Sequence, residues 1–341
     1  MPKNSTKILL LLTLVGGMLI SISSNSWLGV WMGLEINLLS FIPMMIDKKN
    51  MYTMEASLKY FLIQALASST LIFLIIFMMI IIPLPVYAET NYPPSSLIII
   101  PLMLKGGAAP LHWWFPGVME GLNWMNCFIL MTIQKTSPMI LMSYIIKLDM
   151  LALIFIISSV IIGAMGGFNQ TSTRKILTYS SINHIGWMLS AILMGINTWL
   201  IYFTFYSILI LSIVLTFKNL QMSFINQSYM VGYSPVMKIM LFMVLLSLGG
   251  LPPLLGFLPK WIIIQTTLSN NLSFITTALI TSSLITLYYY LRICYSSFMI
   301  SYTKPKWNKW SLKIFPNKIN SMLSTLSLIG MVICTTLINS F

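Results

Sequence analysis

Residues 105–116 read KGGAAPLHWWFP, and residues 249–260 read GGLPPLLGFLPK. Five positions of the first stretch return in the second at one constant offset: Gly106, Gly107, Pro110, Leu111 and Pro116 recur as Gly249, Gly250, Pro253, Leu254 and Pro259. Proline removes a backbone donor and glycine favours non-helical conformations, so each stretch should interrupt a helix. The sequence therefore predicts two broken helices that an internal repeat places in corresponding positions.

The surrounding sequence is that of a membrane protein. Of its 341 residues, 57% are hydrophobic and 7% are charged. Charge-free stretches that each hold one or two of the ~20-residue apolar segments a bilayer requires run over 8–34, 60–88, 176–217, 239–259 and 261–291. We expect an all-α, polytopic membrane protein, a single membrane domain over 1–341.

Hydropathy between the turn-rich breaks predicts about eleven transmembrane helices. They cover 8–22, 26–46, 55–82, 96–115, 123–146, 150–168, 175–195, 198–217, 237–266, 273–297 and 320–339. The two broken helices are then the fourth and the ninth, and this odd spacing inverts the topology between copies. We expect two inverted five-helix repeats, 8–146 and 150–297, followed by a basic loop and closing helix in 298–341. The first apolar run is expected to be a retained helix, not a cleaved targeting segment.

The distribution of charge predicts the orientation. With eleven helices, nearly all lysines and arginines fall in connections on one side of the membrane, and the other side has only Lys147. By the positive-inside tendency, the N-terminus should face the cytoplasm or the mitochondrial matrix, and the C-terminus the opposite compartment. The net charge of +13 does not indicate nucleic acid, because the basic residues are scattered through short connections.

Cofactor motifs are missing from the sequence. Cys127, Cys294 and Cys334 are far apart and form no CxxC or Cys/His cluster, so we expect no iron–sulfur, haem or zinc site. Neither GxGxxG nor GxxxxGK[ST] occurs, so we expect no nucleotide site and no cofactor bound by this chain.

Four ionisable residues stand inside the apolar segments: Glu35, Lys105, Lys135 and Lys260. A charge at the bilayer centre costs roughly 2.5 to 3.5 kcal/mol, so such residues usually face a protein interior or an ion path. Burial disfavours the charged form of lysine and a nearby carboxylate favours it. A pairing of Glu35 with Lys105 or Lys135 whose separation changes would therefore form a proton gate. The alternative is a static ion pair that fixes helix register, although three lysines to one glutamate argues against a purely static role.

Two histidines are candidate relays. His112 lies in the first broken segment and His184 lies in the helix expected at 175–195. Imidazole titrates near neutral pH, but a histidine hydrogen-bonded to a neighbouring helix is the equally good structural alternative. The breaks themselves are either hydrated functional elements, whose freed carbonyls need partners or water, or plain packing kinks. Glu55 and Lys59, one turn apart, are expected to form an interfacial pair.

Five stretches carry a resemblance to a known family: 25–37, 55–61, 105–116, 180–187 and 248–261. They closely resemble chain 2 of mitochondrial NADH:ubiquinone oxidoreductase, in particular its insect-type members, and the match covers nearly the whole chain. The resemblance implies an antiporter-like, proton-translocating subunit in the membrane arm of respiratory complex I. It also implies a multi-pass protein of the mitochondrial inner membrane, with its N-terminus in the matrix and its C-terminus in the intermembrane space.

The resemblance assigns roles to the charged residues. Glu35 and Lys105 correspond to the family's gate pair, Lys135 to its central relay lysine, and Lys260 to the lysine that exchanges protons with the far side. The resemblance further implies that NADH, FMN, iron–sulfur clusters and ubiquinone are bound by other subunits. Expected partners are other membrane-arm subunits, including other antiporter-like ones, and lipids, but not nucleic acid.

Three other functions fit parts of the sequence. A stand-alone cation/proton antiporter would share the repeats and the buried lysines, and could run on a gradient alone. A structural subunit that conducts nothing would keep the same fold. A redox enzyme in its own right fits least, since the chain has no cofactor motif.

Overall fold

The structure is a computed structural model that describes all residues except 1–4, 48–49, 82–93, 228–234, 253 and 300–341. Every named element in the described ranges is a helix. The closing helix expected at 320–339 and Pro253 lie outside the described residues, as does 298–341 apart from its first two positions.

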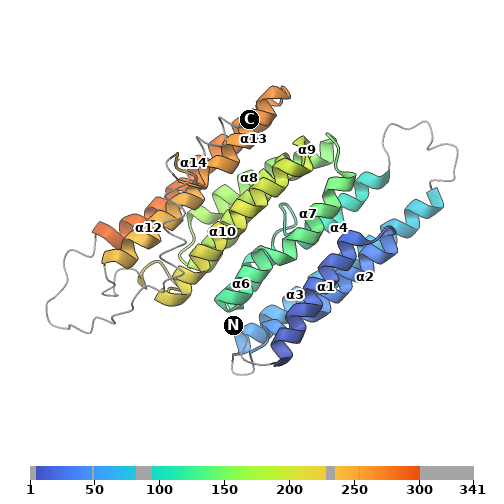
Figure 1. The fold of residues 1–341 in the computed structure, drawn as a ribbon, viewed down its shortest axis with the longest axis horizontal. Helices are drawn as coiled ribbons and strands as arrows, with labels where there is room; N and C mark the ends of the chain where they lie inside the picture. Colours follow the sequence, from blue (N-terminus) through green and yellow to red (C-terminus); the bar gives the residue numbers. More distant parts are fainter. Residues whose placement is uncertain (1–4, 48–49, 82–93, 228–234, 253, 300–341) are drawn as a thin grey trace. The chain divides into compact units, whose positions relative to one another are not determined.

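The chain divides into two compact units, within Met1–Phe155 and within Ile156–Phe341, and the division falls inside one helix. Figure 1 shows the helices by colour. The first unit contains α1 (Ser5–Ser23), α2 (Trp27–Met45), α3 (Met51–Ile81), the short 3₁₀ helix η2 (Pro94–Ile98), α4 (Ile99–Gly106), α5 (Trp114–Gly121), α6 (Trp124–Met131), α7 (Ile133–Ile145) and the start of α8 (Met150–Phe168). The second contains the rest of α8, α9 (Thr173–Met194), α10 (Ile196–Leu220), α12 (Pro235–Gly249), α13 (Phe257–Ser269) and α14 (Ser273–Met299).

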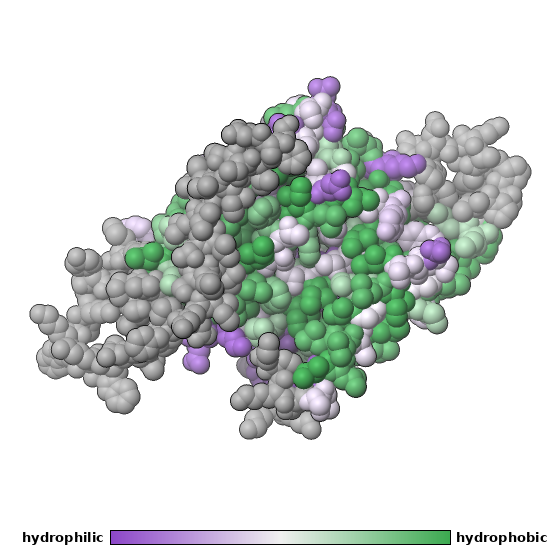
Figure 2. Space-filling view, viewed as in Figure 1, coloured by the Kyte–Doolittle hydropathy of each residue, from purple (hydrophilic) through white to green (hydrophobic). Residues whose placement is uncertain are grey.

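Six of the described helices, α1, α2, α3, α8, α10 and α14, are long and apolar enough to cross a membrane. Helix α9 has 22 residues, but its buried Thr178, Ser180, Ser181, Asn183 and His184 make it more polar. Large apolar side chains point outward along α1, where Leu9 and Leu12 are 61% and 68% exposed. Figure 2 shows apolar residues over much of the described surface on the visible face. Such a surface requires an apolar solvent, which is the inside of a bilayer.

Helices α1 and α2 pack closely because glycines face each other. A Cβ atom on Gly33 would lie 2.5 Å from the backbone nitrogen of Ser21 and 2.8 Å from the carbonyl oxygen of Gly17. Small residues let two backbones approach closely, which is the usual way in which membrane helices gain packing energy. The N-terminus of α2 is capped by Ser26, whose Oγ accepts a hydrogen bond from the Gly29 N–H at 3.3 Å.

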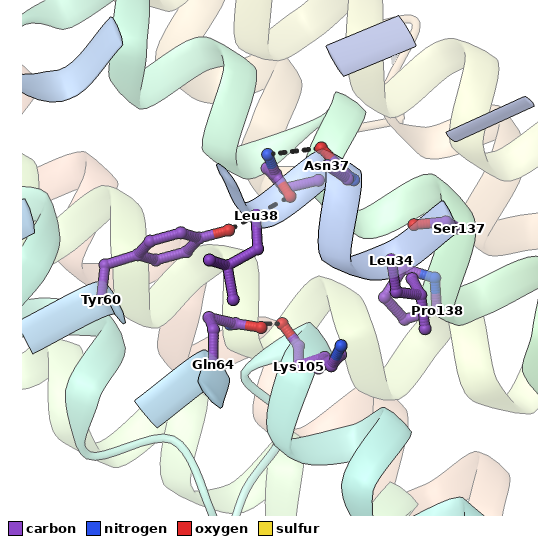
Figure 3. A pocket seen from close by; sticks show the side chains of 9 residues that line it. Leu34, Asn37, Leu38, Tyr60, Gln64, Lys105, Ser137 and Pro138 are labelled. Carbon is purple, nitrogen blue, oxygen red and sulfur yellow. Dashed lines mark hydrogen bonds between the residues drawn. The ribbon is translucent and has the colours of Figure 1, made fainter. Parts of the chain in front are cut away.

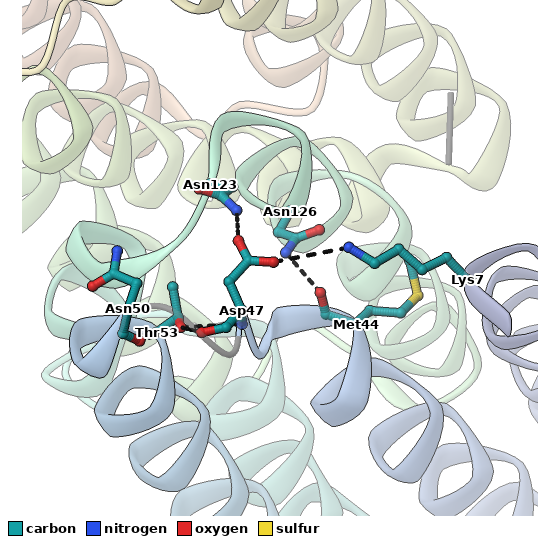
Figure 4. A network of polar contacts seen from close by, with 7 residues as sticks. All are labelled: Lys7, Met44, Asp47, Asn50, Thr53, Asn123 and Asn126. Atoms are coloured by element: carbon teal, nitrogen blue, oxygen red, sulfur yellow. Dashed lines mark hydrogen bonds and ion pairs between the residues drawn. The ribbon is translucent and has the colours of Figure 1, made fainter. Parts of the chain in front are cut away.

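A polar network joins four helices at one end of the first unit (Figure 4). Asp47, just after α2, pairs with Lys7 of α1 at 3.8 Å and accepts a hydrogen bond from Asn123, which precedes α6. The Thr53 hydroxyl of α3 accepts from the Asp47 N–H at 3.2 Å. Asn126 of α6 donates to the Met44 carbonyl at 2.9 Å. These bonds fix how the chain turns between α2 and α3.

The prediction of a single helix over 123–146 was wrong, because two helices cover this range. Helix α6 ends at Met131 and α7 begins at Ile133, with Thr132 at φ −115° and ψ −77° between them. The Thr132 hydroxyl donates to the Phe128 carbonyl at 2.7 Å. Threonine side chains compete in this way with the backbone and bend helices. Lys135 therefore lies in the first turn of a second short helix.

Replacing Gly33 by Ala should destabilise the contact between α1 and α2. The added methyl group meets backbone atoms that cannot move aside, and overpacking of this kind costs about 1 to 3 kcal/mol. Gly16→Ala is the matched control, because a Cβ atom there meets nothing within 4 Å. The measurement is the thermal unfolding midpoint in detergent, and equal midpoints for the two variants would contradict the packing.

Candidate functional site

The first interruption lies between α4 and α5. Gly107 has the left-handed φ of +73°, and its N–H donates to the Leu104 carbonyl at 3.2 Å. The Ala108 N–H donates to the Met103 carbonyl at 3.0 Å. Glycine ends helices in this conformation because it has no Cβ atom to clash. Pro110 follows, after a cis peptide bond.

Side chains add hydrogen bonds to the last carbonyls of α4. The Trp114 indole N–H donates to the Leu104 carbonyl at 3.2 Å. The Gln64 amide of α3 donates to the Lys105 carbonyl at 3.3 Å. In an apolar solvent each free carbonyl is costly, so these neutral donors stabilise the break from within the protein.

The second interruption lies between α12 and α13, and a lysine caps it. Gly250 has φ +81°, and its N–H donates to the Leu246 and Ser247 carbonyls at 3.1 Å each. Lys260, in the first turn of α13 and 5% exposed, donates from Nζ to the Gly249 carbonyl at 2.9 Å. The C-terminal end of a helix carries partial negative charge, and the Lys260 side chain donates its hydrogen bond to that end of α12.

Glu35 and Lys105 lie in the first unit without forming an ion pair among the described residues. Lys105 stands in the last turn of α4 and is 7% exposed. Glu35 is half-buried on α2, and its Oε2 atom accepts no hydrogen bond from the residues that the structure describes. Leu34, the residue before Glu35, lines the same small cavity as Lys105. The two charged residues therefore belong to one neighbourhood but do not form a closed salt bridge.

Lys135 is buried against the first broken segment. It is 1% exposed, and its Nζ lies 4.7 Å from the centroid of the Phe115 ring on α5. An aromatic face attracts a cation, and the attraction grows when water is excluded. The packing of α7 against α4 brings Lys135 into the same unit as Lys105.

The two histidines sit in different surroundings. His112 is buried between α4 and α5, with Nδ1 3.3 Å from the Pro110 carbonyl and its ring stacked on Trp113. His184 on α9 has Nδ1 2.7 Å from the Tyr202 hydroxyl. That contact gives His184 a partner able to donate or accept a proton.

His184 and Lys260 belong to one aromatic cluster in the second unit. The Trp187 ring, one turn from His184, lies 5.8 Å from the Lys260 Nζ and stacks on Tyr202. Glu35, Lys105, Lys135 and His112 lie in the first unit. The structure thus divides the sequence-predicted residues between the two units and brings only His184 and Lys260 into one cluster of rings.

Sequence reasoning missed three neutral residues beside Lys105. The Tyr60 hydroxyl of α3 donates to Gln134 Oε1 at 3.2 Å, and Gln134 Nε2 donates to Asn37 Oδ1 at 2.9 Å. Asn37 lies on α2, and Gln134 immediately precedes Lys135 on α7. An amide at membrane depth is the signal that could have identified Asn37 and Gln134.

Comparisons with known proteins identify the family. A family model described as "NADH:quinone oxidoreductase/Mrp antiporter, TM" matches residues 24–286. The chain belongs to this family. NADH-ubiquinone oxidoreductase chain 2 of Anopheles gambiae is 52% identical over 96% of this chain and 94% of that protein. The same-named protein of Locusta migratoria is 46% identical over 98% of each.

Solved structures share the fold of this antiporter-family chain. A chain of respiratory complex I from Thermus thermophilus superposes with a TM-score of 0.81 at 21% identity, over 97% of this chain and 79% of that one. A chain of the Mrp complex from a Dietzia species superposes with a TM-score of 0.72 at 17% identity, over 85% and 60%. At these identities the likeness shows the fold alone.

Gly250→Ala should be far more damaging than Gly106→Ala. A Cβ atom on Gly250 would lie 2.9 Å from Lys260 Nζ, and its φ costs an L-residue roughly 1 to 2 kcal/mol. A Cβ atom on Gly106 meets nothing within 4 Å. Thermal unfolding of both variants in detergent tests this, and an unfolding midpoint for Gly250→Ala as high as that for Gly106→Ala would contradict the assigned cap.

Proposed function

We propose that this chain is an antiporter-like, proton-translocating subunit of the membrane arm of respiratory complex I, in the mitochondrial inner membrane. One observation carries the proposal: Lys105 and Lys260, almost completely buried, flank the two helix interruptions of a chain that belongs to the NADH:quinone oxidoreductase/Mrp antiporter family. Buried lysines persist at membrane depth where they move ions or protons.

The proposed path consists of Glu35, Lys105, Lys135 and Lys260, with His112 and His184 as candidate relays. Glu35 and Lys105 form the gate, because Lys105 and Leu34, the neighbour of Glu35, line one cavity while the two charges form no salt bridge in the described residues. Lys135 is the central relay and Lys260 exchanges protons with the far side. Gly106, Gly107, Pro110, Gly249, Gly250 and Pro253 make the breaks.

The proposed architecture has eleven transmembrane helices in two inverted repeats, 8–146 and 150–297, with 298–341 closing the domain. The two helix breaks support the repeat, because Gly107 and Gly250 occupy matching motif positions and have similar positive φ values, +73° and +81°. The excess of positive charge supports an N-terminus in the matrix and a C-terminus in the intermembrane space.

The energy for pumping has to come from other subunits. Moving one charge against 100 mV takes about 2.3 kcal/mol. Within the described residues no group of three or more His, Cys, Asp and Glu could hold a metal ion. We propose that NADH, FMN, the iron–sulfur clusters and ubiquinone are bound by other subunits, and that this chain contacts other membrane-arm subunits and lipids.

A stand-alone cation/proton antiporter is the second candidate function. The family description, which names the Mrp antiporter, favours it. The isolated subunit in liposomes distinguishes the two functions. Exchange driven by a gradient alone would favour the antiporter, and no exchange favours the complex I subunit.

Lys135→Met should abolish most proton pumping while the subunit still inserts and assembles. Removing a charge from an apolar helix eases insertion. The measurement is protons pumped per NADH oxidised by the assembled complex in proteoliposomes. Lys147→Met is the control, because Lys147 is exposed in a connection. Normal pumping by fully assembled Lys135→Met complex would count against the relay and favour a structural subunit.

Glu35→Gln and Lys105→Met should each lower pumping, and the double variant should lose less than the sum of the two losses. Each single change leaves the other group without its electrostatic partner, which is the condition for non-additivity. The measurement compares the pumping rates of the unchanged complex, the two single variants and the double variant at equal amounts of assembled complex. Each rate loss is converted into an activation free energy, and losses that add within about 0.5 kcal/mol would show that the two residues act independently.

A further inference from the structure

A small polar cavity lies beside Lys105 in the first unit (Figure 3). Helices α2, α3, α4 and α7 line it. The space open to the centre of a water molecule is about 10 Å³, which is about the room that one water needs. The lining residues are Leu34, Asn37, Leu38, Tyr60, Gln64, Lys105, Gln134, Ser137 and Pro138.

Most of the polar lining is already satisfied. Tyr60, Gln134 and Asn37 form one hydrogen-bonded chain, and Gln64 donates to the Lys105 carbonyl. Because Gln134 bonds to both α2 and α3, it fixes the first turn of α7 at the wall of the cavity. Ser137 is three residues further along α7, on the same face as Gln134.

Ser137 is the exception in this lining. Its side chain is completely buried, and its Oγ atom has no hydrogen-bond partner among the described residues. Other buried helical serines donate to the carbonyl three residues earlier, as Ser159, Ser180 and Ser190 do at 2.8 to 2.9 Å. A buried hydroxyl left without a partner costs roughly 1 to 3 kcal/mol, so this one is expected to bind something in the cavity.

Ser137 differs in this from Thr136, the residue before it, which donates to the Ile133 carbonyl at 2.7 Å. The Ser137 hydroxyl has no partner among the described residues and lines the cavity together with Lys105, the one charged residue of the lining.

We infer that the cavity binds one water molecule between Ser137 Oγ and Lys105 Nζ, and that Ser137 positions this water to take a proton from Lys105. This inference rests on the proposed function. In the step, one proton and its charge move from the Lys105 nitrogen to the water oxygen. At the same time the water passes one of its own protons on toward neutral Lys135, the next group of the proposed path, so that Lys105 becomes neutral, Lys135 becomes charged and the water is water again. Ser137 keeps its own proton and holds the water by a hydrogen bond.

A carboxylate near Lys105 favours the ammonium form, which is the proposed part of Glu35 in the gate. The neutral cavity with its single positioned water gives the proton a route by which it can leave Lys105. Ser137 is thus a positioning residue for the gate and not a proton carrier itself.

Ser137→Ala should lower the rate of proton pumping by about tenfold at normal assembly, because a hydrogen bond to a charged group is worth about that factor in rate. Ser143→Ala is the matched control, since Ser143 lies on the same helix and donates to the Ile140 carbonyl at 2.6 Å. Both variants are measured as the complete complex in proteoliposomes, beside Lys135→Met.

A second pair of variants separates the hydroxyl from the space it fills. Ser137→Thr and Ser137→Val have nearly the same shape, but only threonine keeps the hydroxyl. The threonine variant should pump several-fold faster than the valine variant. Equal rates would overturn the inference, because the cavity volume alone would then matter. A high-resolution map of the complex should also show water density between Ser137 and Lys105 that Ser137→Ala removes, and unchanged density would overturn it too.

The outcomes distinguish this inference from the proposed function. Normal pumping by Ser137→Ala together with a large loss in Lys135→Met overturns the role of Ser137 and leaves the proposed function standing. Normal pumping by both variants overturns the proposed function, and with it the inference.

Discussion

A helix inside a bilayer can be interrupted only where another group takes the hydrogen bonds that the interruption releases. This constraint governs the whole structure, because the buried lysines lie at or near interrupted helix ends. At the first break a tryptophan indole and a glutamine amide take the carbonyls of Leu104 and Lys105. At the second, Lys260 itself takes the Gly249 carbonyl. The buried lysines and the hydrogen bonds that complete the interrupted helix ends are therefore parts of the same local structure.

The two breaks have the same backbone but different chemistry. Gly107 and Gly250 have nearly the same left-handed conformation, so the repeated motif determines the shape of the helix end. Neutral donors complete the first end, so the Lys105 ammonium is not part of that cap. At the second end the ammonium is part of the cap. The Lys260 side chain is accordingly held by a backbone carbonyl and an aromatic face, whereas Lys105 lines a cavity with neutral residues.

The sequence predicted the helix breaks well because Gly-Gly and Pro act locally on the backbone, whatever surrounds them. The buried lysines were also predictable, since charges are rare in apolar stretches. The interruption at Thr132 was not, because threonine is common inside helices and only the local contacts decide whether its hydroxyl bends the chain. The contacts in the cavity lining beside Lys105 were not predictable either. Gln64, Asn37 and Gln134 come from three helices, and a sequence pattern can mark an amide at membrane depth but not which helix faces meet.

Helix α3 is longer than a bilayer requires. Its 31 residues rise about 46 Å at 1.5 Å each, whereas the hydrocarbon core is about 30 Å thick. The excess is taken up by tilt or by projection into the headgroup region. The exposed pair of Glu55 and Lys59, 2.6 Å apart in the early turns, marks the end that projects. Tyr60 and Gln64 follow at once, so the helix changes from paired charges to a phenol and an amide within two turns. In a thicker bilayer a longer part of α3 would lie within the hydrocarbon core. The ion pair limits this length, because beyond it Glu55 and Lys59 would lose their water.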